Sequence, residues 1–157
     1  MAWEYLKVFH LLFMMAFFAG TIVSTMAGIR ARKAQEIETV ATLTRMSSSA
    51  GLFLTTPAFM LTGLFGVLTA QQQNLALMDT AWLNAAYGAT VIVFVLGVGV
   101  MVRRDVRAAR LAARDQIMGS RSPELDAALS ERLPMLVGPV LHALVAYLVV
   151  MMVFQPT

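Results

Sequence analysis

Long apolar runs alternate with short polar segments along this chain. A helix needs about 20 apolar residues to cross the hydrocarbon core of a bilayer. Four runs meet that length, and they predict transmembrane helices over residues 3–29, 49–70, 80–102 and 134–154. The pattern therefore predicts an all-α integral membrane protein, a four-helix bundle formed by a single domain of residues 1–157.

Positive charge gathers in two of the polar segments. Residues 30–48 and 103–133 hold every Lys and Arg except Lys7, whereas residues 71–79, between the second and third runs, hold none. Lys and Arg are enriched in the loops on the cytoplasmic side of membrane proteins. We therefore expect two cytoplasmic loops, both termini on the outer (periplasmic) side, and a multi-pass location in the cytoplasmic (inner) membrane.

The second charged segment is long enough to form helices of its own. Val106 and Leu111 recur among arginines, which indicates that the third helix continues past the membrane. Ser122 followed by Pro123 has the pattern of a helix N-cap and first turn. We therefore expect a cytoplasmic helical extension between the third and fourth transmembrane helices.

Prolines and glycines predict where the spans bend or approach one another. Pro57 and Pro139 fall inside spans, where a missing N–H donor favours a kink. Small residues allow membrane helices to pack closely. We expect close approaches at Gly20, Gly28, Gly63, Gly66, Gly97 and Gly99.

Five arginines form a basic surface where the third span ends. They are Arg103, Arg104, Arg107, Arg110 and Arg114. This surface either contacts anionic lipid headgroups or a partner protein, or only stops translocation of the helix. The positive-inside pattern also explains the pI of about 9.8, so we expect no nucleic-acid partner.

Composition narrows the chemistry further. The chain is 59% apolar and 13% charged, outside the usual range for soluble domains. It contains no cysteine, which excludes disulfides, thiolate metal sites and iron–sulfur clusters. No nucleotide-binding loop, zinc motif or Ser-His-Asp arrangement is recognisable, so hydrolase or kinase chemistry is not expected.

His10 and His142 are the ionisable groups expected deepest in the membrane. At about 1.5 Å per residue, their depths differ by roughly 9 Å, which argues against one iron held by both. Counting along each helix predicts two layers of polar residues. The outer layer contains His10, Thr62, Tyr87 and Tyr147, and the deeper layer contains His142, Thr55 and Thr56.

These layers support several functions. A histidine bonded to a Tyr or Thr hydroxyl can be purely structural, and His10 can instead bind the iron of haem b, or a porphyrin. We expect a protein that acts by binding, either to haem or porphyrin or as an accessory subunit of a larger membrane complex, rather than an enzyme. Its expected partners are the lipid bilayer and other membrane subunits or a second copy.

Three alternatives remain open. One is a porphyrin- or quinone-linked membrane oxidoreductase in which His10 is ligand or base, with Tyr87 and Tyr147 beside it. Another is a small metal or solute transporter lined by His10 and His142. A methionine copper site is less favoured, because the 12 methionines are most simply apolar packing.

Several short motifs resemble a known group of membrane proteins. They are Leu6-Lys7-Val8-Phe9-His10 with Ala19-Gly20, Thr56-Pro57-Ala58-Phe59 with Phe65-Gly66, Trp82-Leu83, and Gln155-Pro156. The chain resembles HemJ-type protoporphyrinogen oxidases, a related uncharacterised family of small bacterial integral membrane proteins and, more distantly, CopD-like copper-resistance domains. The resemblance implies a four- or five-helix bundle in which His10 contacts haem or porphyrin. Because Asn84 and Ala86 stand where the HemJ pattern has His and Lys, the uncharacterised family fits better.

Overall fold

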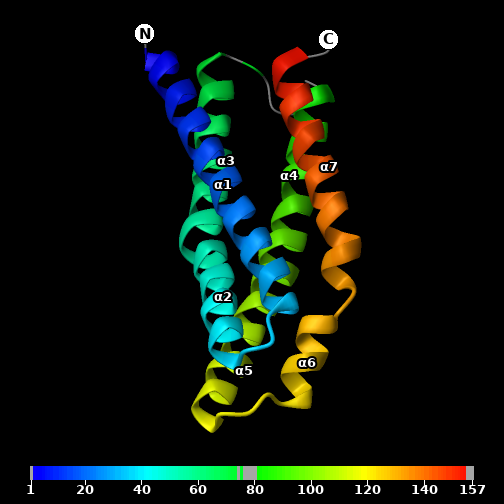
Figure 1. The fold of residues 1–157 in the computed structure, drawn as a ribbon. Coiled ribbons are helices and arrows are strands. Elements are labelled where there is room, and N and C mark those ends of the chain that lie inside the picture. The colour runs from blue at the N-terminus through cyan, green and yellow to red at the C-terminus, as the bar shows by residue number, and fades with distance from the viewer. Residues whose placement is uncertain (1, 74, 76–80, 155–157) are drawn as a thin grey trace.

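The computed structural model describes residues 2–73, 75 and 81–154, and this part of the chain is built from helices joined by short connections (Figure 1). In chain order these are α1 (Ala2–Lys33), α2 (Ile37–Ser49), η1 (Ala50–Thr55), α3 (Thr56–Gln72), α4 (Ala81–Phe94), η2 (Val95–Val102), α5 (Arg103–Met118), α6 (Pro123–Ser130) and α7 (Leu133–Phe154). Four long helices among these residues are apolar enough to cross a membrane. The all-α membrane bundle is therefore confirmed.

The two ends of the bundle differ. Both termini lie at one end, here named the termini end, and α2, α5 and α6 meet at the other, named the basic end (Figure 1). The second span runs from α2 through η1 into α3, and the third runs from α4 through η2 into α5. The expected start of the third span at Thr80 and part of the preceding connection, residues 74 and 76–79, lie outside the described residues, as do Gln155 and Pro156.

Residues 30–48, expected as a cytoplasmic loop, are helical for most of their length. Helix α1 continues to Lys33 and α2 begins at Ile37, so residues 34–36 make the connection. Helix α2 buries Val40, Thr44 and Ser47 along one face. This amphipathic face packs against protein rather than lipid. A search for membrane-length apolar runs cannot find such a helix.

The helical extension between the third and fourth spans is confirmed. Helix α5 ends at Gly119, whose φ of 68° is left-handed and suits glycine at a helix C-terminus. Helix α6 begins after Ser122, whose hydroxyl accepts a hydrogen bond from the backbone N–H of Leu125 at 3.3 Å. The N-cap predicted at Ser122 is thus present.

The backbone responds differently to the two prolines inside spans. The π-helical segment η1 ends just before Pro57, and both the backbone N–H and the hydroxyl of Thr56 donate to the carbonyl of Gly51. A missing proline donor disturbs the α-helical ladder, and a π-type segment is one way to absorb the disturbance. Pro139 lies inside α7, which continues through it.

Two apolar clusters hold the helices together. At the basic end, buried residues of α2, α5 and α6 form one cluster: Val40, Ala41, Ala112, Leu125 and Leu129. In the spans, Ala86, Ala89 and Val93 of α4 pack against Leu148 of α7. Phe9 and Phe13 of α1 stack on Phe65 of α3 with ring centroids 5.3 and 5.4 Å apart. The spans therefore form two pairs, α1 with α3 and α4 with α7 (Figure 1).

One aromatic side chain joins the two pairs. The Phe59 ring of α3 lies 5.2 Å from Phe17 of α1 and 6.3 Å from Phe94 of α4, measured between centroids. Phe59 also packs against the α4–α7 cluster. This contact fixes the relative height of the two pairs.

Close packing at glycine occurs at fewer positions than expected. A Cβ at Gly20 would lie 2.5 Å from Oγ1 of Thr55, and one at Gly66 would lie 3.2 Å from Cε1 of His10. A Cβ at Gly28 would meet Ser47 at an ordinary 3.7 Å. At the other three expected positions a Cβ would have no atom of another described segment within 4 Å: Gly63, Gly97 and Gly99.

Candidate functional site

His10 lies half-buried on α1 and is bonded to the neighbouring helix α3. Its Nδ1 atom is 2.8 Å from the backbone carbonyl oxygen of Thr62. A carbonyl oxygen only accepts hydrogen bonds, so Nδ1 is the donor. In the neutral imidazole this places the proton on Nδ1 and leaves the lone pair on Nε2.

A glycine makes room for the imidazole. A Cβ at position 66 would lie 3.2 Å from Cε1 and 3.3 Å from Nδ1 of His10. Those distances are shorter than ordinary van der Waals contacts, so any larger residue would displace the ring or the helix. Gly66 and the Thr62 carbonyl together set the position and tautomer of His10.

The Nε2 atom makes no hydrogen bond to any described residue. Neutral imidazole nitrogen is a common ligand of haem iron, and its other nitrogen usually donates to a carbonyl or carboxylate. His10 matches that donor pattern. Among residues 2–73, 75 and 81–154, no three His, Asp or Glu side chains gather as a ligand set for a bare metal ion.

Of the expected outer layer, Thr62 is the member that the described contacts join to His10. The Phe59–Phe94 contact sets α3 against α4. Gly66 lies seven residues from Phe59 on α3, and Tyr87 lies seven residues from Phe94 on α4. Both steps lead toward the termini end, cover about 10 Å along the helix axis and stay on the same helical face. Tyr87 therefore reaches the level of His10. The direct bond, however, joins His10 to the backbone of Thr62, whose hydroxyl donates to the carbonyl of Ala58.

Tyr147 lies near the same level on α7. Its neighbour Leu148 packs in one cluster with Ala86, next to Tyr87. The Tyr147 side chain is exposed on the surface of the bundle. The described residues contain no hydrogen bond between either tyrosine and His10. The members of the expected outer layer therefore lie at similar heights but do not form a hydrogen-bond network.

The deeper layer is not brought together. His142 is exposed, and its Nδ1 lies 2.7 Å from the carbonyl of Gly138 on its own helix. The Thr55 hydroxyl is buried against Gly20 and lacks a hydrogen-bond partner among the described residues, and the Thr56 hydroxyl donates to Gly51. His142 also lies five residues, about 8 Å, deeper than Tyr147.

The predicted arginine surface divides into two groups. Arg104 is only 11% exposed and binds Asp105, Glu131 and the carbonyl of Ala128 at 2.9–3.1 Å. Arg114 binds Asp115, Ser122 and Glu124. The other three stay exposed: Arg103, Arg107 and Arg110.

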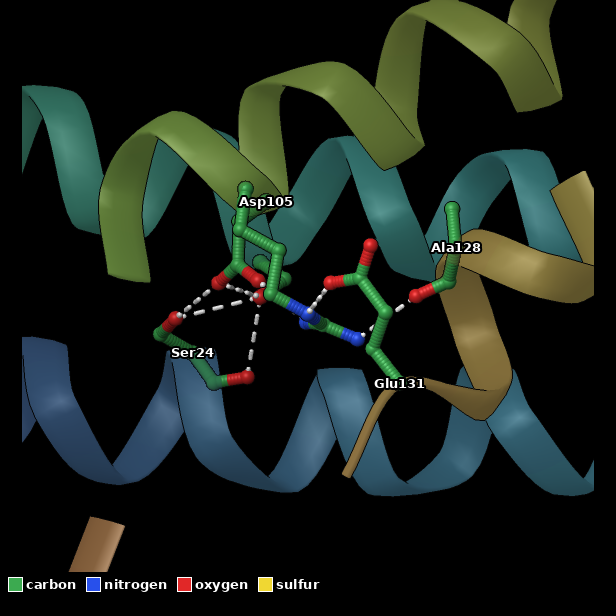
Figure 2. Close-up of polar contacts among 6 residues, drawn as sticks. Ser24, Asp105, Ala128 and Glu131 are labelled. Carbon is green, nitrogen blue, oxygen red and sulfur yellow. Dashed lines mark hydrogen bonds and ion pairs between the residues drawn. The ribbon is translucent and has the colours of Figure 1, made fainter. Parts of the chain in front are cut away.

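Asp105 anchors a network that the sequence interpretation missed (Figure 2). One oxygen of its carboxylate accepts from Arg104 at 3.0 Å, and the other from the hydroxyls of Ser24 at 3.3 Å and Ser47 at 2.9 Å. Ser47 also lies 3.0 Å from the Ser24 carbonyl. The network ties α1, α2, α5 and, through Glu131, the end of α6. Both oxygens of the Asp105 carboxylate accept hydrogen bonds, which suits holding helices more than chemistry.

Two signals in the sequence pointed toward this network. Ser24 is a polar residue near the basic end of an apolar span, and Asp105 is an acid inside an arginine run. Each has an ordinary explanation when taken alone. Their contact depends on how α1 crosses α5, which no local pattern specifies.

A second buried acid fixes the turn between α5 and α6. The Asp115 side chain is fully buried and accepts from the Ser122 backbone N–H at 2.7 Å and hydroxyl at 2.6 Å. Burial alone would raise the pKa of Asp115, but the hydrogen bonds from Ser122 and Arg114 outweigh it and hold that pKa below its ordinary value. Asp115 lies in α5, beyond the apolar part of the third span.

Comparison with known proteins gives one match. A family model described as "Predicted integral membrane protein (DUF2269)" matches residues 4–156. No curated protein and no solved structure matches the chain. The match covers all four spans and the helices of the basic end.

Proposed function

The chain belongs to the DUF2269 family of predicted integral membrane proteins, and we propose that it binds haem b or a related porphyrin through His10. The observation that carries this proposal is the 2.8 Å hydrogen bond from Nδ1 to the Thr62 carbonyl. This bond orients the ring and leaves Nε2 as a ligand, as second-shell carbonyls do for many metal-bound histidines.

The residues around His10 have distinct roles in this proposal. His10 would bind the haem iron, the Thr62 carbonyl would fix the tautomer of its ring, and Gly66 gives the ring its space. Tyr87, at the same height on α4, supplies a polar group near the edge of the site. A bound haem would supply one-electron chemistry. We propose binding rather than catalysis, since the buried acids Asp105 and Asp115 are committed to structural networks.

The first test is an absorption spectrum of protein purified from its native membrane in mild detergent. Wild-type protein should carry near-stoichiometric haem and show a Soret band. Its absorption spectrum should change when dithionite is added. His10→Gly should lose the band, and imidazole added to the buffer should restore it by entering the vacated space. The matched control His142→Gly should keep the band. Colourless wild-type protein that takes up no added haem would refute the proposal.

A role as accessory subunit is a second candidate, and His142 favours it. This residue is exposed on a membrane-spanning helix, on the same face as the exposed side chain of Met135 seven residues before it. A polar side chain facing lipid is costly, whereas one facing a partner helix can be satisfied. Stoichiometric co-purification of a second membrane protein, lost in His142→Leu and retained in His10→Leu, would support it. Purification without a partner would refute it.

We also propose that the basic end lies in the cytoplasm and that both termini lie outside the inner membrane. Of the 12 Lys and Arg residues, only Lys7 lies toward the termini end, which follows the positive-inside rule. The chain has no cysteine, so single cysteines can report sidedness without background. In intact cells, an impermeant thiol reagent should label Gln71→Cys and spare Gln116→Cys; the reverse result would invert the topology.

A further inference from the structure

A groove lies at the basic end where the second and third spans meet. It has a volume of about 710 Å³, and its lining includes Leu52 of η1, Val98 and Val102 of η2, and three arginines of α5, Arg103, Arg107 and Arg110. The two π-helical segments are in close contact here, since a Cβ at Gly51 would lie 3.4 Å from Val102. Local π-helical geometry is frequent at functional sites.

The three arginines carry charge that the fold does not neutralise. Positions 103, 107 and 110 lie on one helical face and span about 10 Å of the axis. All three side chains are exposed, and the described residues offer them no ion pair. Arg104 and Arg114, by contrast, are held by acids. The groove therefore has three free guanidinium groups along one edge.

The lining of the groove changes from apolar to basic where the apolar part of the spans ends. Leu52, Val98 and Val102 belong to the apolar part of the spans, and Arg103 begins the charged helix α5. Such a site offers an apolar wall at the depth of acyl chains and cations at the depth of headgroups. Guanidinium groups bind phosphate oxygens with strong, charge-assisted hydrogen bonds, and basic pockets between transmembrane helices bind anionic headgroups.

We propose that this groove binds an anionic glycerophospholipid, with its phosphodiester at Arg103, Arg107 and Arg110 and an acyl chain along Leu52, Val98 and Val102. The continuous apolar wall favours a lipid over free phosphate or an acidic peptide, because neither of those covers it. The proposal is independent of haem binding at His10, which lies toward the opposite end.

Native mass spectrometry of the full chain, titrated in detergent with phosphatidylglycerol or phosphatidylcholine, tests the proposal. Wild type should bind phosphatidylglycerol selectively. The variant Arg103→Gln/Arg107→Gln/Arg110→Gln should weaken that binding about 100-fold, since each basic residue near an anionic surface contributes about a fivefold effect. The matched control Arg30→Gln/Arg45→Gln/Arg132→Gln removes three exposed arginines outside the groove and should bind as wild type does.

A second pair of variants tests the apolar wall without changing charge. Leu52→Trp fills the groove and should weaken phosphatidylglycerol binding about tenfold by excluding the chain, whereas Leu64→Trp, on an exposed face elsewhere in the spans, should not. Equal losses in both arginine triples, or no preference over phosphatidylcholine, would overturn the site. Competition by inorganic phosphate with no effect of Leu52→Trp would identify a phosphate site and overturn the lipid assignment.

Discussion

The largest fully buried apolar side chains of the described residues lie at the basic end rather than in the membrane spans. Leu125 and Val40, at the basic end, are fully buried. In the spans, Phe53 is 79% exposed and Met15 is 67% exposed on the surface of the protein. Water requires protein to cover apolar groups, whereas lipid tails cover them in a bilayer. The apolar surface of the spans is therefore suited to contact with lipid, and the basic end has a small core covered by protein.

The polar groups follow the same division. At the basic end, Asp105 and Asp115 accept hydrogen bonds in networks that tie helices together. Toward the termini end, α1 and α3 are joined by stacked phenylalanines and the single bond of His10 to Thr62. The networks of the basic end thus hold the helices together. The Nε2 atom of His10, in the spans, makes no hydrogen bond to a described residue.

The largest difference in the free energy of unfolding is expected when the same substitution, leucine to alanine, is made in each region. Leu125→Ala should destabilise the fold by about 3 kcal/mol, because it removes a fully buried side chain and leaves a cavity. Leu64→Ala, where Leu64 is 52% exposed, should change stability by less than about 0.5 kcal/mol. Reversible unfolding in mixed detergent–SDS micelles measures both. Equal losses would show that the spans are also tightly packed against protein.

The next prediction compares the stability lost when an acid is removed from a buried network with the stability lost when one is removed from a surface ion pair. Asp105→Ala should cost about 2 kcal/mol, since it leaves Arg104 and two serine hydroxyls short of an acceptor. Asp126→Ala removes an acid that is 56% exposed and paired with Arg121, and should cost about 0.5 kcal/mol. The same unfolding assay applies. A smaller loss for Asp105 than for Asp126 would contradict the anchoring role.

Glycine variants test close packing inside the spans. Gly20→Ala should destabilise by about 1–2 kcal/mol, because the new Cβ would meet the Thr55 hydroxyl at 2.5 Å and its backbone nitrogen at 3.1 Å. Gly63→Ala has open space and should be neutral or slightly stabilising, since alanine favours helix. If both variants behave alike in thermal unfolding, α1 does not pack against the η1 segment as described.

The last prediction concerns how the stabilising contribution of Asp115 depends on pH. Because the pKa of Asp115 is lowered in the folded protein, its carboxylate contributes stability above its unfolded pKa, about 3.9. That contribution is lost as pH falls through the lower folded value. The stability difference between wild type and Asp115→Asn should stay constant above about pH 5 and shrink below about pH 4. A difference that grows on acidification would contradict this sign.

Local patterns predicted the features that depend on few residues. Apolar run length identified the spans, and the Ser122-Pro123 pattern identified the start of α6. Helix α2 was missed because its buried face includes Thr44 and Ser47, which do not form a hydrophobic run. The sidedness inferred from Lys and Arg stays a prediction.

The candidate site depended on contacts that periodicity does not encode. Depth counting placed Thr62 beside His10, but the partner is the Thr62 backbone carbonyl rather than its hydroxyl. The division of the arginines into bound and free groups required the positions of Asp105 and Asp115 on α5 and of Glu131 at the end of α6. Neither feature follows from spacing along one helix.

Electron paramagnetic resonance of the ferric, haem-loaded protein tests the central proposal most directly, that His10 and not His142 would bind the haem iron. With one imidazole and no second strong ligand, the iron should give a high-spin signal that His142→Ala leaves unchanged and His10→Ala abolishes. A low-spin bis-histidine signal that depends on His142, or haem bound equally well without His10, would contradict the account.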